Sequence, residues 1–179
     1  WTTFLNKLWE RGHDGSGGDT GGIGMTGLNG NAANNPLGEN SFATGTSNNI
    51  PGDNSASSGT SNYVDGIRSG GTGTANHISS DNTSFAGDGN ISETGANNSS
   101  IDGQTNKNYS LHGRVSGANN QAGDSAENPA TNFAIDVHGS NNIGKKSLNF
   151  LRGIGNVVNS YLGFVLNGKN STVNAEGAG

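Results

Sequence analysis

The chain has 179 residues, of which only 28% are hydrophobic and 13% are charged, a composition too poor in apolar side chains for a thick two-layer core. Its net charge of −5 comes without a cluster of lysines or arginines, which argues against a nucleic-acid partner. No apolar run approaches the roughly 20 residues of a membrane-spanning helix, and the absence of cysteine excludes disulfides and thiolate metal sites.

The first twelve residues predict a short amphipathic arm for assembly. Its large apolar residues recur with helical spacing and are Trp1, Phe4, Leu5, Leu8 and Trp9. A helix of this length is unstable alone, so we expect it either to cap its own domain or to pack on a neighbouring subunit. Residues 13–39 are rich in glycine and asparagine and predict a linker. Residues 22–27 spell a dinucleotide-binding glycine pattern, but this pattern requires a strand followed by a helix, so no cofactor is expected.

From residue 40 the sequence repeats with a period of 14 residues. Each unit has a central glycine and an asparagine three residues later. The glycines are Gly45, Gly59, Gly73, Gly87, Gly103, Gly117, Gly139 and Gly153, and the asparagines are Asn48, Asn62, Asn76, Asn90, Asn106, Asn120, Asn142 and Asn156. A two-residue insertion before Gly103 and a longer one around residues 124–131 shift the frame without breaking the pairing of glycine with asparagine.

Apolar residues follow the same frame. Two positions before the glycine stand Ala43, Phe85, Ile101, Val115, Val137 and Leu151, with Ser57 and Gly71 as exceptions. Five positions after it stand Ile50, Val64, Ile78, Ala122 and Val158, with Ser92, Asn108 and Gly144 as exceptions. The alternation around these sites is typical of short strands. Each repeat therefore predicts two short strands, and the stacked repeats predict an all-β solenoid of about eight rungs over residues 40–179.

The recurrent asparagine predicts a ladder position in this solenoid. Asparagine tolerates the left-handed backbone conformation of a tight turn, and its side-chain amide can hydrogen-bond to the same amide one rung away. We therefore expect the eight asparagines to form a structural ladder rather than a binding site.

The phrase Asn-Ser-x-Ala-x-Gly, with Gly-Asp-Asn-Ser at residues 52–55 leading into the next copy, resembles the head repeats of YadA-like trimeric autotransporter adhesins. The resemblance is best over residues 40–95. It implies a left-handed β-roll, three chains that pack side by side, and a surface that binds host matrix or receptors. The chain departs from that family at the near-constant asparagine, where the family usually has alanine or serine.

Residues 148–166 are the most apolar part of the chain. This segment predicts a better-packed set of rungs, with a partner-binding or membrane-active segment as the alternative. His77 and His138 fall at outward-facing positions of the repeat, and the four histidines show no metal-ligand spacing. Serines and aspartates are so numerous that a Ser/His/Asp trio is expected by chance, so no catalytic or metal-binding residue is predicted.

These features predict a protein that is not an enzyme, that lies outside the cell or on its surface, and that acts as an adhesin head or adhesive rod. The alternative is a structural subunit of a self-assembling extracellular filament or biofilm-matrix fibre. Both hypotheses predict self-association, as a trimer or a filament, and the first adds a host or matrix ligand. An ice-binding solenoid would need a flat array of identical threonines, and the outward positions vary too much for that.

Overall fold

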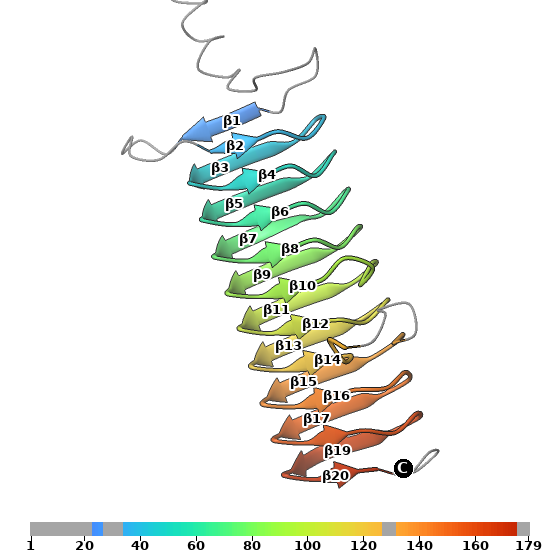
Figure 1. The fold of residues 1–179 in the computed structure, drawn as a ribbon. Helices are drawn as coiled ribbons and strands as arrows, with labels where there is room; N and C mark the ends of the chain where they lie inside the picture. The colour runs from blue at the N-terminus through green and yellow to red at the C-terminus, as the bar shows by residue number, and fades with distance from the viewer. Residues whose placement is uncertain (1–22, 27–33, 127–131, 175–179) are drawn as a thin grey trace, which may run out of the picture.

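The computed structural model describes residues 23–26, 34–126 and 132–174, and these form an all-β solenoid. Two parallel sheets of ten strands run along the rod, one of long strands and one of short strands, and the chain alternates between them (Figure 1). At about 4.8 Å per rung the rod is roughly 45 Å long. The described residues include no helix that is long and apolar enough to cross a membrane.

The long strands are β1 (Ile23–Thr26), β3 (Phe42–Thr46), β5 (Ala56–Thr60), β7 (Gly70–Thr74), β9 (Ser84–Asp88), β11 (Ser100–Gln104), β13 (Arg114–Ala118), β15 (Asp136–Ser140), β17 (Phe150–Ile154) and β19 (Phe164–Lys169). The short strands are β2 (Asn35–Pro36), β4 (Asn49–Ile50), β6 (Tyr63–Val64), β8 (His77–Ile78), β10 (Ile91–Ser92), β12 (Lys107–Asn108), β14 (Gln121–Ala122), β16 (Ile143–Gly144), β18 (Val157–Val158) and β20 (Thr172–Val173). The prediction of two short strands per repeat is confirmed. Successive long strands pair in register, so that Gly45 lies beside Gly59 and Gly59 beside Gly73.

The solenoid has about ten rungs, two more than the repeat predicts. The additional first rung is β1 with β2, which pair with β3 and β4 although both lie within the predicted linker. The additional last rung is β19 with β20. The predicted boundary at residue 40 is therefore too late. The proposed arm, residues 1–12, lies outside the described residues.

The core consists of two columns of inward side chains, one from each sheet. The long strands contribute Ala43, Phe85, Ile101, Val115, Val137, Leu151 and Val165, and the short strands contribute Ile50, Val64, Ile78, Ala122 and Val158, all buried. Burying each large aliphatic or aromatic side chain contributes roughly 1.5–3 kcal/mol. A core two side chains wide is thus sufficient because it is continuous from rung to rung.

The exceptions in these columns are compensated by a neighbour. A Cβ on Gly71 would lie 2.9 Å from Cγ of Phe85, so the phenylalanine ring on the next rung already fills that space. Likewise a Cβ on Gly144 would lie 3.0 Å from Cγ2 of Ile135, which is fully buried. The packing is therefore conserved across rungs although the residue at a single position is not.

Left-handed residues make the two corners of each rung. The residue just before the ladder asparagine has positive φ, as at Ser47 (56°), Ser61 (57°) and Ala75 (55°). The ladder asparagines themselves do not have positive φ. The expectation that the asparagine supplies the left-handed conformation is therefore wrong, and its role lies in its side chain.

Candidate functional site

The buried asparagine column joins each rung to the next through side-chain amides. Asn62 Nδ2 donates to Asn48 Oδ1 at 2.9 Å and to the carbonyl oxygen of Gly73 at 2.9 Å. The main-chain N–H of Asn62 donates to the same Asn48 Oδ1 at 3.1 Å. Equivalent contacts continue along a column whose buried members are Asn34, Asn48, Asn62, Asn76, Asn90, Asn106, Asn120, Asn142 and Asn156. The column supports the fold, and its polar atoms are occupied by these bonds.

The central glycines form a second structural column. Each has positive φ, for example 121° at Gly59 and 133° at Gly73, a conformation that side chains disfavour. A Cβ on Gly59 would overlap the carbonyl oxygen of Gly73 on the next rung. Glycine is therefore required both by the backbone conformation and by the close approach of the next rung.

The outward side chains of the long strands form what we call the outer face. On β3, β5 and β7 it carries hydroxyl groups on both sides of the glycine, from Thr44, Thr46, Ser58, Thr60, Thr72 and Thr74. Thr44 Oγ1 and Ser58 Oγ lie 2.8 Å apart and form a hydrogen bond between rungs. Among the described rungs this hydroxyl array covers only three, since Asp88 and Asp102 bring charge onto β9 and β11.

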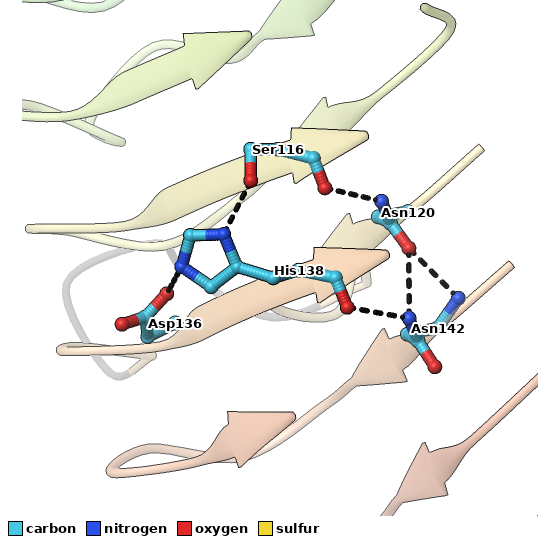
Figure 2. Close-up of polar contacts among 5 residues, drawn as sticks. All are labelled: Ser116, Asn120, Asp136, His138 and Asn142. Carbon is cyan, nitrogen blue, oxygen red and sulfur yellow. Dashed lines mark hydrogen bonds and ion pairs between the residues drawn. The ribbon is translucent and has the colours of Figure 1, made fainter. Parts of the chain in front are cut away.

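On β13 and β15 the outer face holds a Ser/His/Asp cluster. His138 lies between Ser116, its direct neighbour on β13, and Asp136, two residues earlier on its own strand (Figure 2). Ser116 Oγ contacts Nδ1 of His138, and the Asp136 carboxylate contacts Nε2. Arg114 lies beside Asp136 and Arg152 beside His138 in the strand register. His138, which the repeat places at a solvated position, is therefore held by partners on both ring nitrogens.

A histidine between a carboxylate and a hydroxyl can take the hydroxyl proton, as in serine hydrolases. Acyl transfer also needs hydrogen-bond donors for the developing oxyanion. Here β15 is paired on both sides, by β13 and β17, so its main-chain N–H groups are used in the sheet. We interpret the cluster as a polar contact that fixes the orientation of His138.

The last two rungs carry an exposed apolar surface, which we call the C-terminal apolar patch. It lies on the outer face of β17 and β19 and on the corners that lead into them, and it comprises Leu148, Phe150, Ile154, Leu162, Phe164 and Leu166. Leu162 is 58% exposed and Leu166 54% exposed, while the Phe150 and Phe164 rings stack with centroids 5.2 Å apart. The apolar segment thus supplies the core through Leu151, Val158 and Val165 and also presents a surface, so the prediction of better-packed rungs describes only part of it.

On the short-strand face, the pKa of Tyr109 is raised, mainly because the phenol is partly buried and to a smaller extent because the carboxylate of Glu93 is near. Tyr63 and His77 contact each other across neighbouring rungs of the same face, with ring centroids 4.8 Å apart and ring planes tilted by 53°. Over residues 23–26, 34–126 and 132–174, no group of three or more histidine and carboxylate side chains is placed to hold a metal ion.

The structure brings the predicted ladder residues together, whereas the predicted arm, Trp1, Phe4, Leu5, Leu8 and Trp9, lies outside the described residues. The cluster around His138 has no signal in sequence spacing, because Ser116 and His138 are 22 residues apart across the longer insertion.

No protein-family model matches the chain, and a search of curated proteins finds no match.

Proposed function

We propose that this protein is a non-enzymatic rod, extracellular or on the cell surface, that acts as an adhesin head or adhesive rod through its outer face. The observation that carries the proposal is the difference between the two sides of the long strands. The inward columns keep glycine and asparagine, and in most rungs an apolar residue, whereas the outward columns keep no residue type along the rod.

The outward columns change chemistry in order along the rod. Hydroxyl groups on β3 to β7 are followed by Asp88 and Asp102, then by Arg114 and the Ser/His/Asp cluster, and finally by the C-terminal apolar patch around Arg152. A rigid sheet that holds such side chains at fixed spacing can contact a large ligand at many points without a pocket. Interfaces of this kind gain specificity from the arrangement of charges and affinity from the apolar part.

The proposal is tested by binding of the purified chain to immobilised extracellular-matrix proteins, measured by surface plasmon resonance. The outer-face variant Asp102→Ser/Arg114→Ser should lose most of the binding. The matched control Asn49→Ser/His77→Ser changes outward positions of the short-strand face and should bind as the unmodified protein does. Equal binding by both variants, or no binding by the unmodified chain, would overturn the proposal.

A second candidate is a subunit of a self-assembling extracellular filament or biofilm-matrix fibre, and the C-terminal apolar patch favours it. Exposed apolar surfaces of this extent are typical of protein contacts. Negative-stain electron microscopy over a concentration series tests this candidate: long filaments that grow with concentration support it, and isolated short rods at every concentration exclude it.

A further inference from the structure

We infer that the C-terminal apolar patch is a contact surface between two copies of this chain, related by a twofold axis that lays β17 of one copy over β19 of the other. The inference goes beyond both proposed functions: it needs self-association through this patch alone, without a filament, and it is independent of ligand binding by the rest of the outer face.

The area of the patch suits a contact between two copies. A large apolar side chain that is half exposed leaves roughly 100 Å² in contact with water. Five of the six patch residues are 44–58% exposed and Phe150 is partly buried, which gives roughly 500–600 Å² per copy. Two patches face to face would bury about 1,100 Å² before their rims are counted, close to the lower limit of about 1,200 Å² for a stable interface.

The patch is also complementary to itself. Its two rungs carry the same residue types at two positions, with Leu148 and Phe150 on one rung and Leu162 and Phe164 on the next. A twofold contact requires that residue i of one copy meet residue j of the other while j meets i. Exchange of the two rungs satisfies this requirement, because leucine then faces leucine and phenylalanine faces phenylalanine.

The charges around the patch favour the arrangement in which β17 of one copy lies over β19 of the other. They disfavour the arrangement in which β17 lies over β17. Arg152 lies on the outer face of β17, where its guanidinium stacks on the Phe150 ring at 4.8 Å. If β17 lay over β17, the two Arg152 side chains would meet, and like charges at a contact disfavour that arrangement. The register between β17 and β19 shifts by one residue, so that Leu166 and Asn167 stand opposite Arg152. With β17 over β19, Arg152 therefore faces Leu166 and Asn167 of the other copy, and Ile154 faces the aliphatic stem of Lys169.

The first test is the mass of the chain in solution by analytical ultracentrifugation over a concentration series. We expect a dimer of twice the 18.0 kDa chain mass. Phe164→Ser should raise the dissociation constant at least tenfold. The matched control Phe42→Ser removes a partly exposed phenylalanine from the same outward position on β3 and should leave it unchanged. A monomer at every concentration, a trimer, or equal dissociation constants for the two variants would overturn the inference.

The second test determines which rungs meet. Because the chain has no cysteine, Leu148→Cys and Leu162→Cys each introduce a single thiol. Mixed and oxidised, these variants should form disulfides between unlike chains, which a mass tag on one chain identifies. Disulfides only between like chains, or none between unlike chains, would refute the proposed symmetry. Matrix binding of Phe164→Ser, measured separately, shows whether the adhesin proposal survives loss of the dimer.

Discussion

Replacing one ladder asparagine tests the structural role of the whole column. We expect Asn76→Val to destabilise the solenoid far more than His77→Val, although the two residues are adjacent and receive the same side chain. Asn76 is 1% exposed and lies within the ladder, whereas His77 is exposed on the short-strand face.

The magnitude follows from the bonds of the Asn76 side chain. Its Oδ1 accepts the main-chain N–H and the Nδ2 of Asn90, both at 3.0 Å, and its Nδ2 donates to Asn62 Oδ1 at 2.9 Å and to the Gly87 carbonyl at 2.7 Å. Valine leaves the buried N–H of Asn90 without this acceptor, at a cost of about 1–3 kcal/mol. Each further hydrogen bond that valine removes costs about 1 kcal/mol, unless the remaining group keeps another partner. Asn90 Nδ2 keeps the Gly103 carbonyl and Asn62 Oδ1 keeps the N–H of residue 76, so the total is about 3 kcal/mol.

Urea unfolding followed by far-ultraviolet circular dichroism measures the difference, and hydrogen exchange locates it. His77→Val should cost under about 1 kcal/mol, because an exposed position away from the core tolerates substitution. The amides of residue 90 and its neighbours should lose protection in Asn76→Val and keep it in His77→Val. Equal unfolding midpoints for the two variants would refute the ladder as a source of stability.

Three further predictions concern the corners, the glycine column and the titration of a tyrosine. Arg68 has φ of 56° at a position where four of nine rungs have asparagine, so Arg68→Asn should stabilise the fold by roughly 0.5–1 kcal/mol in the same urea assay, and a lower midpoint would contradict this. Gly87→Ala would place a Cβ against the Gly103 carbonyl and should cost about 3 kcal/mol or more, whereas a Cβ on Gly89 would meet only Thr105 Oγ1, at an ordinary contact distance of 3.9 Å, and Gly89→Ala should cost about 1 kcal/mol; similar costs would show that close approach of the rungs is not the constraint. The raised pKa of Tyr109 means that the folded state holds this proton more tightly than the unfolded state, so stability should fall as the pH rises through the ordinary tyrosine value of 10.0, and Tyr109→Phe should reduce that fall; an unchanged pH dependence would contradict it.

The fold class could be predicted because the inward positions of a solenoid are each constrained once per rung. Glycine and asparagine recur for steric and hydrogen-bonding reasons, and the apolar columns recur because each rung packs on the next. The first rung escaped prediction because its long strand lacks these markers, although Asn34 continues the ladder one period before Asn48. Thr26 stands beside Gly45 in the glycine column, and Ile23 pairs with Phe42 at a separation of 19 residues, outside the 14-residue period.

The outward features could be predicted less well, since neighbours on the outer face come from different rungs. Ser116 and His138 become neighbours only if the insertion between them is known to leave the register intact. The C-terminal apolar patch could not be predicted for a different reason. In Phe164, Val165 and Leu166 the apolar residues occupy both faces of the strand in succession, so alternation cannot separate the core residue from the two exposed ones.

The two corners of each rung differ in what they tolerate, and the difference indicates where this fold accepts change. From β3 onward, two residues separate each long strand from the following short strand in every rung described. The opposite corner has five residues between β4 and β5 but seven between β10 and β11 and thirteen between β14 and β15. The first corner is fixed because the ladder asparagine must reach both the previous amide and the next glycine carbonyl, and one more residue would break both bonds. The ladder continues across the longest insertion, with Asn142 Nδ2 bonded to Asn120 Oδ1 at 3.2 Å. The long insertions therefore lie at one corner and the outward columns vary most in residue type, and these are the surfaces on which a binding function can change without loss of the fold.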